Sequence, residues 1–174
     1  KPLTVKIAEI EKPDVPLWAI WSVQQYAKFC GEGKCIEKYA KLVDDIITYI
    51  MEGGHPNLRL DDNGLLYSEG RDVAVTWMNS TANGRPVVPR TGYIVEFNAL
   101  WYNALRFGAM LKRQQGDEAG ATELESKAEV TKTSFVSTFL NEYGYLLDYV
   151  DGNMMDWSVR PNMIFAVALD YSPL

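Results

Sequence analysis

A helical hydrophobic period runs through residues 36–50 of this 174-residue chain and limits its choice of fold more than any other pattern. Apolar side chains recur there at intervals of three and four residues: Ile36, Tyr39, Ala40, Val43, Ile46, Ile47 and Ile50. Charged residues fill the gaps, so the segment is predicted to be an amphipathic helix. Residues 17–29 are apolar on nearly every side, which predicts a mostly buried helix. Gly31 and Gly33 separate the two segments, and this short connection favours an antiparallel helical hairpin.

The same pairing of a buried and an amphipathic helix recurs downstream. Residues 95–112 are apolar almost all round, whereas residues 119–141 carry only a narrow apolar stripe. A third buried helix is expected over residues 161–169, with Pro161 in its first turn. Buried helices that alternate with amphipathic ones predict a double ring of hairpins with the buried helices inside. The expected fold class is therefore all-α, as an incomplete α/α toroid.

Two long connectors interrupt the helical pattern. Residues 53–93 contain two strand-like runs, 57–60 and 65–68, around a turn at Gly64 that predicts a small β-hairpin. A second connector covers residues 143–160. Connections of this length are uncommon in compact domains unless they build a site. Both lead into the start of a buried helix, so we expect them to meet at one mouth of the ring.

Composition excludes several classes of partner. Seventeen Lys and Arg against 23 Asp and Glu give a net charge of −6, and the basic residues are scattered, so nucleic acid is not an expected partner. No apolar run approaches the ~18 residues that a membrane helix needs, so no membrane partner is expected. The single histidine, His55, is expected to be exposed at a helix end, and no metal or cofactor is expected. Cys30 and Cys35 are interpreted as small residues at a helical turn.

The densest polar and aromatic cluster spans the end of the first connector and the start of the next helix. Its members are Thr76, Trp77, Met78, Asn79, Arg90, Glu96, Asn98 and Trp101. Three blocks of sequence around it occur in a distinctive order: VPLWAIWSVQQY at 15–26, VTWMNSTANGRPVVPRTGYIVEFNALWYNAL at 75–105, and RPNMIFAVALDYSPL at 160–174.

These blocks resemble the amylo-α-1,6-glucosidase domain of the glycogen debranching enzymes. That family has a PLWFFWALQQY helix, a TWM(D) segment followed by a TPR-like tripeptide and VE(I/F)NALWYNAL, and an RPNQIFAVSLPYSPL stretch. The resemblance implies an (α/α)6 barrel that hydrolyses α-1,6-linked glucose at glycogen branch points with inversion. It also implies a cytoplasmic location and an α-glucan, glycogen or limit dextrin, as the partner.

An inverting glycosidase needs one carboxylic acid to protonate the leaving oxygen and a second carboxylate to activate water, about 6.5–9.5 Å away. The resemblance places the acid at Asn79, but an amide has no titrating proton to give. Three explanations stay open. The first is that the protein has lost the activity and kept sugar binding. The second is that a neighbouring carboxylate, Glu69, Asp72 or Glu96, replaces the acid. The third is that the chain is a natural or altered variant of an active enzyme. Glu96 lies in the first turn of a helix, where the dipole is expected to lower its pKa, so Glu69 and Asp72 are the better replacements.

Tryptophans in connectors are expected to stack on sugar, whereas Trp18, Trp21 and Trp101 on buried helices are expected to pack in the core. The substrate-binding residues that the resemblance implies are Trp77, Arg90, Glu96, Asn98, Trp157, Arg160 and Asn162.

Chain length bears on what the chain can do alone. A barrel of about twelve helices needs on the order of 300 residues, so residues 1–174 are expected to be a single partial domain. The resemblance implies a base beyond the RPN segment and outside this chain, so the chain alone is expected to be inactive. An unclosed ring leaves apolar helix faces uncovered, which predicts self-association. The alternatives are a non-catalytic α-glucan-binding module and a helical scaffold that binds another protein. Alternation at Leu3, Val5 and Ile7 suggests an extended strand or a cut end.

Overall fold

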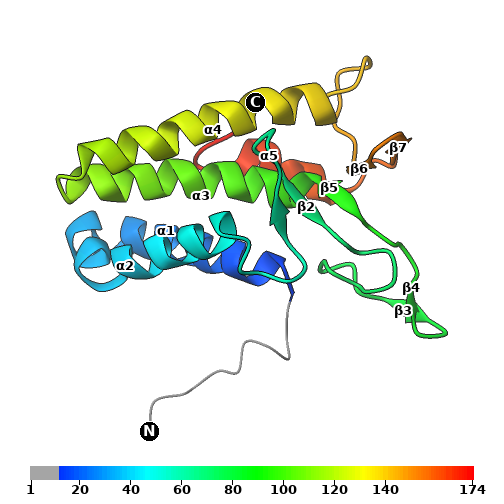
Figure 1. Cartoon of the computed structure of the whole chain (residues 1–174), viewed down its shortest axis with the longest axis horizontal. Helices are drawn as coiled ribbons and strands as arrows, with labels where there is room; N and C mark the ends of the chain where they lie inside the picture. Colours follow the sequence, from blue (N-terminus) through cyan, green and yellow to red (C-terminus); the bar gives the residue numbers. More distant parts are fainter. Residues whose placement is uncertain (1–11) are drawn as a thin grey trace, which may run out of the picture.

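The computed structural model describes residues 12–174, so the strand suggested at Leu3, Val5 and Ile7 lies outside the described residues. Four long helices form the two expected hairpins. Helix α1 (Asp14–Cys30) packs against α2 (Glu32–Met51), and α3 (Val95–Gln114) packs against α4 (Glu118–Phe139). The two hairpins lie side by side, with α3 facing the first hairpin (Figure 1). None of the helices described is long and apolar enough to cross a bilayer.

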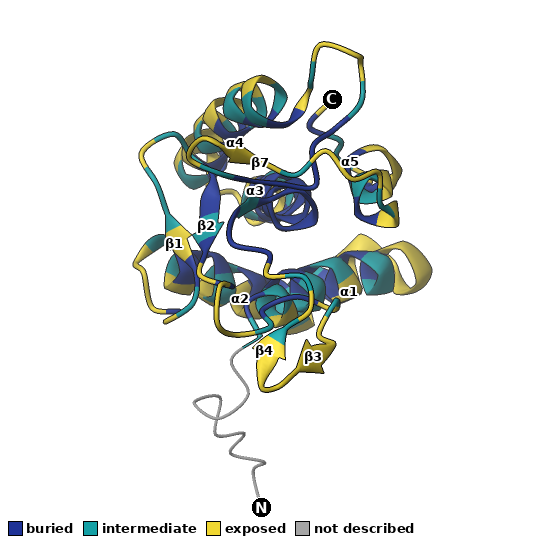
Figure 2. Cartoon of the chain, turned by 90° about the vertical axis from the view of Figure 1, so that its right-hand side faces the viewer, coloured by how far each residue is buried: buried dark blue, intermediate teal, exposed yellow. Residues whose placement is uncertain are grey.

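Helix α3 forms the centre of the core. Fifteen of its 20 residues are buried, because α1, α2, α4 and the C-terminal helix all contact it (Figure 2). The prediction of an all-round apolar, buried helix is confirmed here. A close crossing with α2 occurs at Gly108, where an added Cβ would lie 2.6 Å from Cδ1 of Ile47. The narrow stripe predicted for α4 is also confirmed, since Leu124, Ala128 and Phe135 are buried.

The connectors contain more β-structure than the single hairpin predicted. The hairpin itself is confirmed, as β1 (Arg59–Leu60) pairs with β2 (Leu66–Ser68) in antiparallel register. These strands belong to a five-stranded antiparallel sheet of order β1-β2-β5-β6-β7. The other members are β5 (Gly92–Ile94), β6 (Tyr149–Asp151) and β7 (Met154–Met155). β5, β6 and β7 are too short to show alternation and, unlike β1 and β2, are not joined by a turn signal that the sequence analysis used, so they were not predicted.

A separate two-stranded ribbon projects from the strand-bearing end of the molecule (Figure 1). It consists of β3 (Thr81–Ala82) and β4 (Arg85–Pro86), which pair in antiparallel register. Asn83 and Gly84 form its tip with φ of 52° and 77°, the positive values that a tight hairpin turn requires.

The segment predicted as a third buried helix is shorter and more exposed to solvent than expected. A 3₁₀ turn, η2 (Pro161–Ile164), leads into α5 (Phe165–Ala168). Ile164 and Val167 are 58% and 63% exposed, so the prediction of burial is wrong for this face. The physical reason is that α5 packs on α3 from one side and no described element covers the other.

Helix α1 is also only partly buried. Leu17 and Ile20 face the core, but Trp18 and Trp21 are half-buried and Phe29 is 88% exposed. Trp18 contacts Phe165 edge-on at a ring separation of 5.1 Å. The expectation of a mostly buried helix therefore holds for one face only.

His55 is buried, not exposed as expected. It is 5% exposed, its Nδ1 accepts a hydrogen bond from the backbone N–H of Asn57 at 3.1 Å, and its ring lies 6.5 Å from that of Tyr49. The turn after α2 folds the imidazole back against the helix, a placement that the two preceding glycines permit. Cys30 and Cys35 are unpaired thiols beside the α1–α2 turn, as interpreted from the sequence.

Candidate functional site

A buried ion network joins the two connectors. Both guanidinium amino groups of Arg90 donate to the carboxylate of Glu96 in the first turn of α3, one of them at 2.6 Å. Arg90 also contacts Asp148, with Nε 2.9 Å from Oδ2 and Nη2 donating to Oδ1 at 3.0 Å. All three side chains are 0–1% exposed. Burial of this kind is tolerated only because each charge has a hydrogen-bonded partner.

Asp148 extends the network to the second connector. Its Oδ2 accepts a hydrogen bond from Nη1 of Arg160 at 2.7 Å, and its Oδ1 accepts one from Nδ2 of Asn162 at 2.7 Å. Arg160 also donates to Asp156 at 2.8 Å. The starts of α3 and η2 are therefore fixed together, which confirms that both connectors meet at one end of the molecule.

Trp77 is attached to this network through Asn162. The indole Nε1–H of Trp77 donates to Oδ1 of Asn162 at 2.8 Å, while the ring itself is 54% exposed. Trp77 and Asn162 line an open hollow of about 480 Å³ together with Trp18, Pro161, Ile164 and Phe165. Its wall is mostly aromatic and aliphatic, and the amide of Asn162 is its polar part. A wall of this kind suits a ligand that has both apolar faces and hydroxyl groups.

Asn79 lies two residues beyond Trp77 and is exposed. Its backbone N–H donates to the carbonyl of Trp77 at 2.9 Å, so a tight turn links the two residues. Glu69 and Asp72 are also exposed, on the loop that follows β2. That loop passes directly over Arg90, because a Cβ added at Gly70 would lie 1.9 Å from the Arg90 carbonyl oxygen. No carboxylate in residues 12–174 is hydrogen-bonded to the Asn79 side chain.

Asn98 and Trp157 are placed outside the network. Asn98 is fully buried, and its amide accepts a hydrogen bond from the N–H of Leu66 at 2.7 Å and donates to the carbonyls of Leu66 and Ile94. Its role in this structure is to fasten β2 to the start of α3. Trp157 lies after β7 and contacts the rings of Tyr143 and Tyr145.

The electrostatics of Glu96 differ from the expectation. Burial raises the pKa of Glu96, and the hydrogen bonds and charge of Arg90 oppose that rise only in part. The helix start does favour the charged form, but its effect is smaller than the desolvation, so the expected lowering is wrong. Both oxygens of Glu96 are bonded to Arg90, which assigns this carboxylate to the support of Arg90.

The pKa of Asp156 is shifted in the opposite direction. Its partial burial tends to raise the pKa, but hydrogen bonds from Ser158 and Arg160 outweigh burial and lower it. Asp156 is therefore ionised at neutral pH. No cluster of three or more metal-ligating side chains occurs in the part of the chain that the structure describes.

Asp148, the centre of the network, was not among the residues singled out from the sequence. A signal was present, since two leucines precede it and Tyr149 and Val150 follow it. An apolar run predicts a buried strand, and a carboxylate inside such a run has to be paired with a cation.

Comparison with known proteins gives one finding. The family model described as amylo-alpha-1,6-glucosidase matches residues 7–174, essentially the whole chain. No curated protein and no solved structure matches it.

Proposed function

Since this chain belongs to the amylo-alpha-1,6-glucosidase family, we propose that it is part of a glycogen debranching glucosidase that releases α-1,6-linked glucose at branch points. We further propose that its hairpins are an arc of an (α/α)6 toroid. In support, the central α3 is buried between the α1–α2 hairpin and its own hairpin partner α4, and both connectors meet at the same end. Reaction with inversion is part of this proposal.

The observation that carries the proposal is the hydrogen-bonded path from the buried network to the exposed indole of Trp77. Asp148 holds Asn162 at 2.7 Å, and Asn162 holds Trp77 at 2.8 Å. A tryptophan fixed through its N–H presents a preset ring face, so a sugar that stacks on it loses little orientational freedom on binding. Trp77 lies two residues before Asn79, the position at which protonation of the leaving oxygen is expected.

Each site residue then has a distinct part. Trp77 stacks on the glucosyl ring, and Asn162 orients the indole. Arg90, Glu96 and Arg160 are positioning residues, because their charged groups are paired with other charged groups of the network. Asn79 occupies the acid position without an acid, so Glu69 or Asp72 on the neighbouring exposed loop is the candidate proton donor if the native protein is active.

The test is glucose release from a branched limit dextrin by the full-length protein, its Asn79→Asp variant, and the Glu69→Gln and Asp72→Asn variants. We expect glucose release that Trp77→Ala weakens. A large gain from Asn79→Asp identifies residue 79 as the acid position. Loss in Glu69→Gln or Asp72→Asn instead identifies the replacement. If none of these proteins releases glucose, the glucosidase proposal is refuted.

A second function, α-glucan binding without hydrolysis, is favoured by the amide at Asn79 itself. It predicts heat on titration with maltooligosaccharides and no glucose release from the native protein. Activity in the unmodified protein would exclude this function.

A further inference from the structure

Three aromatic side chains form an exposed cluster away from Trp77. Tyr143 and Trp157 are 73% and 43% exposed, and Tyr145 is half-buried. The two tyrosine rings are nearly parallel, with centroids 6.4 Å apart and planes 19° apart. Trp157 meets both edge-on, at 6.2 Å from Tyr143 and 6.5 Å from Tyr145. We call these three residues the aromatic platform.

Two separate loops build the platform, and hydrogen bonds from backbone N–H groups to side-chain oxygens hold both of them. In the loop after α4, the side-chain oxygen of Asn141 accepts from the N–H groups of Tyr143 and Tyr145 at 2.9 and 3.3 Å. In the loop after β7, Asp156 accepts from the N–H of Ser158 at 2.8 Å and fixes the turn that contains Trp157. The rings are thus preorganised, which lowers the entropic cost of binding.

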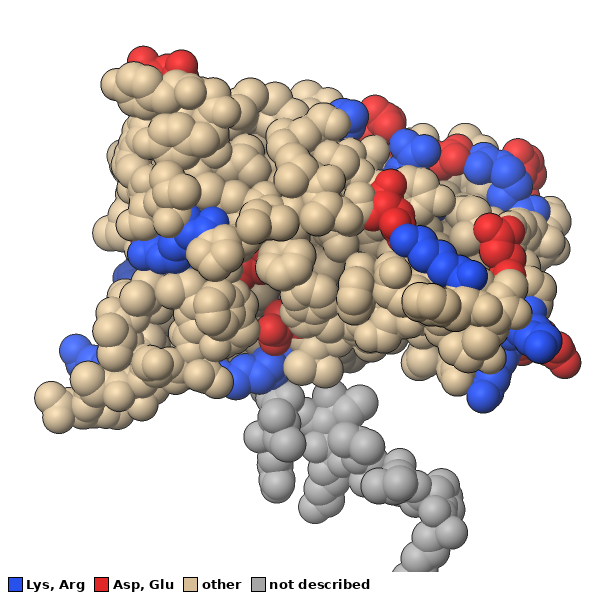
Figure 3. All heavy atoms as spheres, turned by 180° about the vertical axis from the view of Figure 1, so that it is seen from behind, with Lys and Arg blue, Asp and Glu red and all other residues tan. Residues whose placement is uncertain are grey.

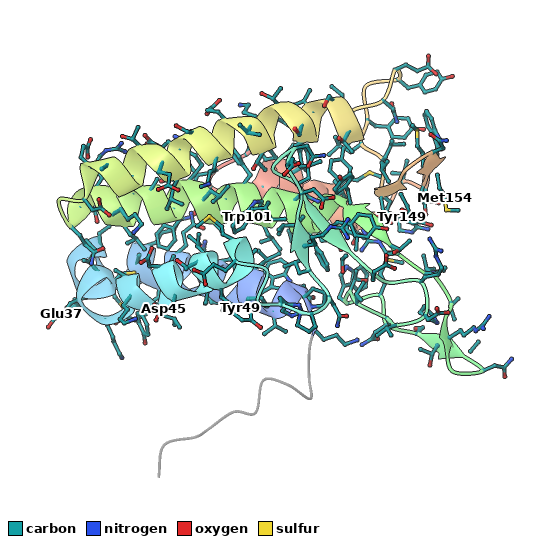
Figure 4. All side chains as sticks on the ribbon, in the orientation of Figure 1. Glu37, Asp45, Tyr49, Trp101, Tyr149 and Met154 are labelled. Atoms are coloured by element: carbon teal, nitrogen blue, oxygen red, sulfur yellow. The ribbon has the colours of Figure 1, made fainter. Side chains whose placement is uncertain are left out.

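Exposed aromatic rings in mutual contact mark a binding surface, because leaving them in water forfeits the free energy of their burial. On the face shown in Figure 3, the upper part of the strand-bearing end is mostly uncharged, with a few basic patches below it and one acidic patch at its corner, whereas charged side chains of both signs are denser toward the helical end. Figure 4 places Tyr149 and Met154, which flank the turn before Trp157, at this end and far from Glu37. A neutral ligand with apolar faces fits such a surface better than an anion or a cation.

We propose that the aromatic platform is a second α-glucan site, which holds linear glucan chain outside the glucosyl unit that Trp77 contacts. A pyranose ring has apolar faces of C–H groups that stack on aromatic rings and an edge of hydroxyls that bond to groups such as the tyrosine O–H. The choice of glucan as the ligand rests on the proposed function; the existence of a binding surface does not.

The ion network connects this site to the first one. Trp157 follows Asp156, which is bonded to Arg160, and Arg160 is bonded to Asp148. From Asp148 the path continues through Asn162 to Trp77. Two exposed tryptophans are therefore fixed to one buried frame, so the spacing between the two sugar contacts is preset.

The experiment is native gel electrophoresis in gels that contain linear amylose, supported by calorimetric titration with maltoheptaose. We expect the wild-type protein to be retarded, and Tyr143→Ala and Trp157→Ala each to weaken the affinity about tenfold. Tyr143→Phe and Trp157→Phe keep a ring and retain most of the binding. Phe29→Ala removes an aromatic ring that is 88% exposed at the helical end, and as the matched control it leaves the retardation unchanged.

Three results would overturn the proposal: no retardation of the wild type, alanine variants that bind as the wild type does, or variants that change only the elution volume in gel filtration, which would mark a protein interface. Circular dichroism checks that each variant is folded. If Trp157→Ala does not fold, the binding of Tyr143→Ser, which alters the most exposed ring, is the test of the proposal. Glucose release without platform-dependent binding refutes only the platform. Ring-dependent amylose binding without glucose release refutes only the hydrolysis.

Discussion

Replacement of Asp148 by asparagine is expected to destabilise the fold strongly, although the change preserves the shape of the side chain. Two cations, Arg90 and Arg160, meet three carboxylates in the network, those of Glu96, Asp148 and Asp156. Asp148→Asn leaves each arginine one carboxylate. It removes the Oδ2 charge that lies 2.9 Å from Nε of Arg90 and the hydrogen bond that this oxygen accepts from Nη1 of Arg160 at 2.7 Å.

The magnitude follows from these two contacts. Hydrogen bonds to charged groups contribute about 1.5–3 kcal/mol each, and loss of one partner of a buried ion pair costs about 3–5 kcal/mol. We therefore expect a loss of about 3–5 kcal/mol in the free energy of unfolding. With a slope of about 2 kcal/mol per M urea, the unfolding midpoint falls by about 1.5–2.5 M.

The assay is urea unfolding followed by far-UV circular dichroism, with Asp45→Asn as the control. Asp45 pairs with Lys41 at 2.7 Å, but their side chains are 58% and 85% exposed, so its loss costs no more than about 0.5 kcal/mol. If Asp148→Asn shifts the midpoint no further than Asp45→Asn does, the network does not organise this end of the molecule and the argument fails.

Three further predictions concern other parts of the chain. Gly92→Ala is expected to destabilise by about 3 kcal/mol or more in urea unfolding, because φ is 95° and the new Cβ would lie 2.2 Å from a carbonyl oxygen of β6; Gly84→Ala, with φ of 77° and open space around it, is expected to cost only about 1 kcal/mol. Asp156 has a pKa below its ordinary value of 3.8, so its stabilising contribution is complete above about pH 4 and is lost as the pH falls through the folded pKa; the urea midpoint falls in that window, and Asp156→Asn flattens the fall. Gel filtration with light scattering is expected to show mass rising with concentration, and the double replacement of Ile164 and Val167 by Asp suppresses this rise; a wild-type mass that stays monomeric at every concentration contradicts the uncovered apolar face.

The parts of the fold that follow a helical period were predictable from the sequence. The buried α3 and the striped α4 extend over many turns, so their patterns average out local exceptions. The burial of α1 and α5 was predicted less well, because a sequence that is apolar all round does not show how many neighbouring elements cover the helix. His55 illustrates the same limit, since the burial of a turn residue depends on how the chain folds back.

The sequence indicated which polar residues lie together at this end of the molecule, but not how they pair. Trp77, Arg90, Arg160 and Asn162 are joined by hydrogen bonds, and the three blocks of sequence pointed to all four. The roles depend on pairing across the connectors, which no local pattern encodes. Asp148 pairs with both Arg90 and Arg160, so the charges of these arginines are neutralised within the protein. Only the structure shows this pairing.

The direct junction between β5 and α3 has a consequence for insertions and deletions. The strand ends at Ile94 and the helix begins at Val95, whose N–H donates to the carbonyl of Asp148 at 3.1 Å, so no linker absorbs a change in length. One residue added here would rotate the whole of α3 by about 100° and turn Glu96 away from Arg90. Additional sequence can instead enter the chain at the tip of the β3–β4 ribbon, where a tag or a peptide insertion leaves the orientation of the central helix untouched.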